Sequence, residues 1–98
     1  MSSFTIRFHP AALSEAEKSQ SWYSERSLKA ANGFVEELSH AVNMVTEAPN
    51  RWPKYQSETR RYIFARYPFS LIYRVKNNII EVLAIAHHRK RPGYWAKR

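Results

Sequence analysis

The chain has 98 residues, 44% of them hydrophobic and none of them cysteine; this is typical of one cytoplasmic globular domain, residues 1–98, and excludes disulfides and thiolate metal sites. No apolar run approaches the roughly 20 residues that span a bilayer, and polar residues interrupt the N-terminus where a signal peptide would be apolar. The net charge of +8 is uneven, because residues 1–50 carry four Lys or Arg against six acids and residues 51–98 carry twelve against two; such a basic half indicates either an acidic or polyanionic partner or a solvated surface.

The first half of the chain predicts one strand and two helices. Residues 4–8 alternate between apolar and polar side chains, as a half-buried strand does. Pro10 suits the first position of a helix, which we expect to continue to about Arg26. Ser27 is suited to cap a second helix, in which apolar residues recur at spacings of three and four until Pro49 ends it.

The second half predicts three short strands after a polar loop at residues 49–59. The strands are expected at residues 60–65, 69–76 and 79–87. Asn77-Asn78 would connect the last two as a tight hairpin, because Asn tolerates a positive φ angle. The resulting order β-α-α-β-β-β predicts an α+β fold, in which a helical hairpin packs on one face of a small, largely antiparallel sheet.

The alternation of side chains along these strands predicts the two faces of the sheet. The residues expected to face the helices are Tyr62, Phe64, Phe69, Leu71, Tyr73, Val75, Leu83 and Ile85. The residues expected on the opposite face are Arg61, Ile63, Ala65, Ser70, Ile72, Arg74, Val82, Ala84 and His88. That second face would be apolar in its middle and basic at its margins, and an uncovered apolar face predicts a partner that covers it.

A polar and aromatic cluster follows the last predicted strand, with the sequence His87-His88-Arg89-Lys90-Arg91-Pro92-Gly93-Tyr94-Trp95. A buried strand holds such groups at a fixed place, which suits binding or catalysis. The two adjacent histidines would point to opposite faces, so one of them is expected to be structural. We expect Trp95 to pack, and Trp22 and Tyr23 to pack between the helices and the sheet. No metal site is predicted, because the chain lacks Cys and its carboxylates are not clustered.

Several short segments occur in an order and spacing that are informative together. They are Pro10-Ala11-Ala12, Trp22-Tyr23, Phe34-Val35-Glu36-Glu37-Leu38, Ala48-Pro49, Arg60-Arg61-Tyr62, Tyr67-Pro68-Phe69-Ser70-Leu71-Ile72-Tyr73, Val82-Leu83-Ala84-Ile85-Ala86-His87 and Arg89-Lys90-Arg91-Pro92-Gly93-Tyr94-Trp95. Over nearly the whole chain they resemble the RelE/ParE superfamily of bacterial toxins from type II toxin–antitoxin systems. The resemblance implies a growth-inhibiting toxin that is neutralised by an antitoxin whose flexible, often acidic segment wraps around it.

The superfamily contains two activities, and its fold does not distinguish them. RelE-type members cut messenger RNA in the ribosome without a metal, whereas ParE-type members poison DNA gyrase and do no chemistry. Metal-free RNA cleavage needs a base, an acid and cations that stabilise the phosphorane; the candidates for these roles are His88, Arg91, Tyr94 and Arg61. The RelE-type pattern has cations where this chain has Ser70 and Ile63, and this departure favours the ParE-like activity.

The resemblance, with the departure at Ser70 and Ile63, therefore implies a toxin that poisons DNA gyrase, needs no cofactor and binds a cognate antitoxin. The residues expected to contact the target are Arg89, Lys90, Arg91, Tyr94 and Trp95. The residues expected to contact the antitoxin are Ile63, Ile72, Arg74 and Ala84. The first alternative is a ribosome-dependent endoribonuclease, with the ribosome and mRNA as partners, and the second is a non-toxic module that binds an acidic partner.

Overall fold

The computed structural model describes residues 4–98, which form two helices and a five-stranded mixed sheet. In chain order the elements are β1 (Thr5–Phe8), α1 (Pro10–Ser24), α2 (Leu28–Glu47), β2 (Lys54–Tyr55), β3 (Thr59–Ile63), β4 (Phe69–Lys76) and β5 (Ile79–His87). The strands lie in the order β1-β5-β4-β3-β2, and β1 pairs with β5 in parallel while the other pairs are antiparallel. The predicted α+β class and helical hairpin are confirmed.

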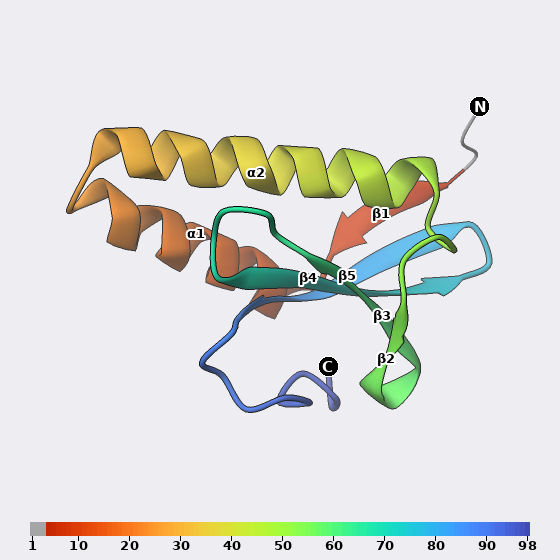
Figure 1. The fold of residues 1–98 in the computed structure, drawn as a ribbon. Helices are drawn as coiled ribbons and strands as arrows, with labels where there is room; N and C mark the ends of the chain where they lie inside the picture. The colour runs from red at the N-terminus through yellow and green to blue at the C-terminus, as the bar shows by residue number, and fades with distance from the viewer. Residues whose placement is uncertain (1–3) are drawn as a thin grey trace.

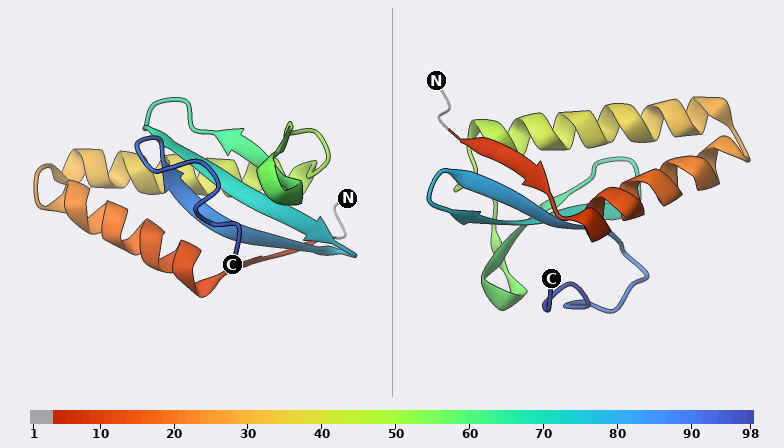
Figure 2. Two further views of the ribbon diagram at one scale, coloured as in Figure 1. Left: turned by 90° about the horizontal axis from the view of Figure 1, so that it is seen from below. Right: turned by 180° about the vertical axis from the view of Figure 1, so that it is seen from behind.

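The molecule has three layers, which Figures 1 and 2 show from different sides. Helices α1 and α2 cover one face of the sheet. The residues after β5, 88–98, which we call the C-terminal segment, run across the opposite face (Figure 1). The sheet therefore lies between the C-terminal segment and most of the helical hairpin, and the two make contact at the edge of the sheet through Glu15 of α1.

Local signals in the sequence set the ends of the helices. Pro10 occupies the first turn of α1, and the His9 imidazole Nδ1 accepts a hydrogen bond from the Ala11 N–H at 3.0 Å. Ser27 caps α2 as predicted, since its hydroxyl accepts from the Ala30 N–H at 3.1 Å. Each cap satisfies a backbone N–H that lacks a partner within its helix.

The main core lies between the helices and the sheet and is rich in aromatic rings. Phe34 of α2 is fully buried and lies within 5.1–6.2 Å of the rings of Tyr23, Phe64, Tyr67 and Phe69. Such edge-to-face and tilted contacts add to the burial of apolar area. A second, smaller cluster lies on the other face of the sheet and consists of Ile72, Leu83, Ala84, Ala86 and Trp95.

The prediction for residues 49–59 was incomplete, because this segment is not only a loop. It contains the short edge strand β2 and a single 3-10 turn, Gln56–Glu58. Two residues carry too little alternation to be recognised as a strand from sequence. The tight connection predicted at Asn77-Asn78 is confirmed, with Asn77 at a φ of 56°.

The predicted faces of β5 were wrong at Val82 and Leu83, which exchange sides. Ile72 pairs with Ala84 while Tyr73 pairs with Val82, so Leu83 is an extra residue on β5. A bulge of this kind shifts the alternation by one residue. Val82 therefore packs in the helix-side core, whereas Leu83 joins the second cluster.

Two further expectations about exposure are corrected. The sheet face opposite the helices is not open, because Ile72 is 1% exposed and Ala84 is 0% exposed beneath the C-terminal segment. Trp22 does not pack between helix and sheet but is 52% exposed, with the Arg26 guanidinium 3.8 Å above its ring. Tyr23, in contrast, packs against the main core as expected.

Candidate functional site

The strand β5 is longer than its neighbour β1, and this difference creates the anchor of the C-terminal segment. Strand β1 pairs with β5 only up to Val82, and the His9 N–H donates to the Val82 carbonyl at 2.8 Å. Beyond that point side chains satisfy the outer edge of β5. The Ile85 N–H donates to the Glu15 carboxylate at 3.1 Å, and Arg98 donates to the Leu83 carbonyl at 2.9 Å. Backbone groups that would otherwise be orphaned are thereby paired.

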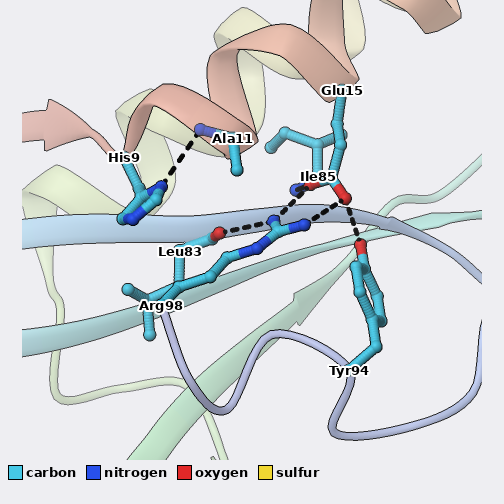
Figure 3. Close-up of polar contacts among 7 residues, drawn as sticks. All are labelled: His9, Ala11, Glu15, Leu83, Ile85, Tyr94 and Arg98. Carbon is cyan, nitrogen blue, oxygen red and sulfur yellow. Dashed lines mark hydrogen bonds and ion pairs between the residues drawn. The ribbon is translucent and has the colours of Figure 1, made fainter.

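Glu15 of α1 joins the helix, β5 and the C-terminal segment, and we call this arrangement the Glu15 clasp (Figure 3). Its carboxylate accepts two hydrogen bonds from the Arg98 guanidinium, at 2.9 and 3.0 Å, and one from the Tyr94 hydroxyl at 2.7 Å. Burial and the bond to Glu15 raise the pKa of Tyr94 well above its usual range. The Tyr94 hydroxyl is therefore a committed donor rather than an available acid.

Trp95 is a second anchor of the C-terminal segment, and it packs on the sheet face opposite the helices. Its indole is 2% exposed and stacks on the ring of Tyr55, at a centroid distance of 5.6 Å. It lies over the second apolar cluster, with Ile72 and Leu83 beneath it. The packing predicted for Trp95 is confirmed, although its Nε1–H has no hydrogen-bond partner within residues 4–98.

Between β5 and the Trp95 anchor the chain presents three exposed cations, Arg89, Lys90 and Arg91, which we call the basic loop. The start of the loop is held in place, since the Arg89 N–H donates to the His87 Nδ1 at 3.0 Å and the His88 N–H donates to the Pro68 carbonyl at 2.9 Å. A loop fixed at both ends loses less conformational entropy when it binds a target.

The two histidines lie on opposite faces, as the alternation predicted. The His87 ring meets the edge of Phe69 at 5.0 Å on the helix side. Burial and then the neighbouring Arg89, His88 and Lys90 lower the pKa of His87, which favours its neutral form. On the other face the His88 Nε2 lies 3.0 Å from the hydroxyl of the buried Ser70.

A cavity of about 340 Å³ lies between the sheet and the C-terminal segment, and we call it the sheet-face cavity. The residues that line it are Tyr55, Arg61, Ile63, Ser70, Ile72, Ala86, His87, His88, Lys90, Pro92, Tyr94 and Trp95. The Arg61 guanidinium lies 4.1 Å above the ring of Tyr55. Cations and hydrogen-bond donors thus share the cavity with an apolar wall.

The structure brings some of the predicted site residues together and separates others. Arg61, His88 and Tyr94 line the sheet-face cavity, whereas the exposed Arg91 does not. Within the predicted antitoxin set, Ile63 is 53% exposed and Arg74 is exposed in an ion pair with Glu81 at 2.9 Å. The other two members of that set, Ile72 and Ala84, are the buried residues described above.

Sequence reasoning missed the anchoring roles of Glu15, Arg98 and Tyr55, which help to hold the C-terminal segment. Glu15 lies 83 positions before Arg98 and looks like an ordinary helix-surface acid. The one signal in the sequence is that the basic second half has only two acids, so some of its cations must pair with acids of the first half or stay unpaired. That signal does not choose among the six acids of the first half.

No helix within residues 4–98 is both long and apolar enough to cross a membrane. The described part of the chain also has no cluster of three or more His, Cys, Asp or Glu side chains that would hold a metal ion.

We compared the chain with protein families and with solved structures. The model of the "ParE toxin of type II toxin-antitoxin system, parDE" matches residues 6–92. A solved structure of the chromosomal ParDE TA system from P. aeruginosa is similar in fold, with a TM-score of 0.75 and 20% sequence identity over 86% of this chain and 95% of that one. No curated protein matches the chain in sequence. Because the family model spans most of its length, this chain belongs to the ParE toxin family of type II toxin–antitoxin systems.

Proposed function

We propose that this ParE-family toxin poisons DNA gyrase without chemistry of its own, using the basic loop as its main contact. The observation that carries the proposal is the presentation of Arg89, Lys90 and Arg91. All three are exposed on a short loop between β5 and the buried Trp95. A fixed group of cations is suited to an acidic protein surface or to DNA phosphates, which are both present in a gyrase–DNA complex.

The arrangement of Tyr94 and Trp95 changes their role in this proposal. Both were expected to contact the target, but Tyr94 is bonded to Glu15 and Trp95 is buried. In the proposed function they position the basic loop instead of touching gyrase. The direct contacts then come from the loop cations.

The proposed second partner is a cognate antitoxin with an acidic segment, for which the family supplies the precedent. The net charge of +10 on residues 51–98 would attract such a segment. Ile63 and Arg74 are the accessible residues of the predicted contact set. Ile72 and Ala84 would be reached only where the C-terminal segment lifts from the sheet.

The ribonuclease alternative gains less support from the geometry. His88 and Arg61 share the sheet-face cavity, yet Arg91 does not line it. Tyr94 donates to Glu15 and its pKa is raised, so it is poorly suited to protonate a leaving oxygen. Lys90 also lines the cavity and could supply charge there, but His88 would then have to serve alone as base and acid.

The experiment that tests the proposal measures DNA supercoiling by purified gyrase in the presence of the toxin, with translation of a reporter transcript measured in parallel. We expect supercoiling to stop while translation continues and the transcript stays intact. Transcript cleavage on the ribosome with normal supercoiling would instead establish the ribonuclease. If both reactions are unaffected and the induced chain does not slow bacterial growth, it is a non-toxic binding module.

A further inference from the structure

The sheet-face cavity carries an excess of positive charge, to which Arg61 contributes from outside the proposed gyrase contact. Its charged lining residues are Arg61 and Lys90, its polar side chains include His88 and Ser70, and none of its lining residues is an acid. Two cations that converge on one cavity repel each other unless an anion joins them. The cavity therefore favours a negatively charged group that accepts hydrogen bonds.

Arg61 differs from Arg60, its neighbour on β3, and from Arg74 of β4, because no described residue accepts a hydrogen bond from its guanidinium. Arg74 is paired with Glu81 at 2.9 Å, and Arg60 donates to the Trp52 carbonyl at 2.6 Å. For the Arg61 guanidinium, the described residues offer only the ring of Tyr55, at 4.1 Å. Tyr55 is in turn stacked on the buried Trp95. The packing thus orients a planar set of five donors and leaves their hydrogen bonds unused.

The rest of the cavity suits an aliphatic stem attached to that anion. Ile63 is 53% exposed where it lines the cavity, and Ile72, Ala86 and Pro92 add apolar wall. A glutamate side chain combines two methylene groups with a carboxylate, and a guanidinium fork binds a carboxylate through two parallel bonds. The unused Nε1–H of Trp95 is a further donor in the wall, although it is covered in this conformation.

From these observations, and resting on the proposed antitoxin partner, we infer that the sheet-face cavity receives one acidic side chain of the antitoxin, which forms a bidentate pair with Arg61. The pair is desolvated between Tyr55 and the apolar wall, so it contributes specificity as well as attraction. Lys90 belongs both to the cavity and to the basic loop. An antitoxin anchored here covers part of the target contact, and this overlap provides a route to neutralisation.

The test measures the affinity of the antitoxin encoded beside this gene for three variants of the full-length toxin. Arg61→Gln removes the fork and is expected to weaken binding by roughly 30-fold or more. Arg61→Lys keeps the charge and loses the fork, so an intermediate loss is expected. Arg51→Gln is the matched control, because Arg51 is an equally charged, exposed residue near Trp52 and outside the cavity, and no more than about a twofold loss is expected.

The partner carboxylate is found by neutralising the antitoxin acids one at a time. One Glu→Gln or Asp→Asn change should be non-additive with Arg61→Gln, as two members of one pair are. Equal losses for Arg61→Gln and Arg51→Gln, or additivity at every acid, would overturn the inference. So would inorganic phosphate that shifts the Arg61 NMR resonances at concentrations where acetate does not, since the cavity would then belong to a nucleic acid phosphate. None of these readouts involves gyrase, so failure of the gyrase proposal is distinguished from failure of the site.

Discussion

At the residue scale, the Tyr67 hydroxyl lies so close to Gly33 of α2 that it leaves no room for a side chain there. A Cβ atom at Gly33 would lie 2.3 Å from the Tyr67 hydroxyl oxygen. That hydroxyl donates to the Ala30 carbonyl at 2.7 Å, and its ring packs edge-on against Tyr23 and Phe34. The ring has little freedom to retreat, so the close approach of helix α2 and Tyr67 requires a glycine.

Two opposing effects are expected for Gly33→Ala. The higher helix propensity of Ala contributes about 1 kcal/mol of stability, whereas overpacking against Tyr67 costs about 1–3 kcal/mol. We therefore expect a net loss in the free energy of unfolding, measured by urea denaturation. In a Tyr67→Phe background the nearest ring carbon is 3.4 Å away, so the same substitution should become neutral or stabilising. A loss of equal size in both backgrounds would contradict this account.

His87 makes a prediction for the dependence of stability on pH. Its pKa in the folded chain is lowered by burial and by the neighbouring Arg89, His88 and Lys90. The unfolded chain therefore binds more protons near this pKa, so stability is lost as the pH falls from about 7 toward 5. His87→Gln should flatten this part of the stability–pH curve, with the exposed His40→Gln as the control for losing one histidine. An unchanged slope in His87→Gln would refute the assignment.

At the scale of elements, the mismatch in length between β1 and β5 connects the helical hairpin to the C-terminal segment. The short β1 leaves Leu83 and Ile85 with outward backbone groups, and Glu15 and Arg98 satisfy both. One carboxylate thereby stabilises α1, the edge of β5 and the C-terminal segment together. The mutual dependence of these elements predicts that they loosen as a unit.

Glu15→Gln tests this connection. It removes the charge that pairs with Arg98 and is expected to cost about 2 kcal/mol in the free energy of unfolding. Amide hydrogen exchange at Ile85 and along the C-terminal segment should speed up, while exchange in the middle of α2 follows only the global loss. The exposed Glu17→Gln on the same helix is the matched control. Equal protection of the segment in both variants would show that Trp95 alone holds it.

At the scale of the whole molecule, the charge is separated along the chain, and the basic loop is its most concentrated part. Replacing Arg89, Lys90 and Arg91 together by Ala should abolish gyrase inhibition. The fold should remain, because none of these side chains is buried. A control variant removes the same charge by changing the exposed Lys29, Arg51 and Lys76 to Ala, and it should inhibit at close to the normal level. Full inhibition by a folded basic-loop variant would exclude that loop from the mechanism.

Much of the local structure could be read from the sequence because short-range physics determines it. The ends of β4 and β5, Pro10 at the first position of α1 and the Ser27 cap of α2 agree with the predictions made from alternation and helix-end preferences. The bulge at Leu83 could not be read, because it depends on the pairing partner rather than on β5 itself. Of the site, sequence indicated the basic loop and the separate faces of the two histidines.

What the sequence alone determined is the class of fold, the family resemblance and the basic character of the second half, all of which follow from local patterns and composition. What only the tertiary structure decided is the state of the sheet face and of the C-terminal segment. The clasp between Glu15 and Arg98 and the stack of Trp95 on Tyr55 join residues that are far apart along the chain. Such contacts depend on how the helices, the sheet and the C-terminal segment pack together, and the pattern of neighbouring residues does not determine that packing.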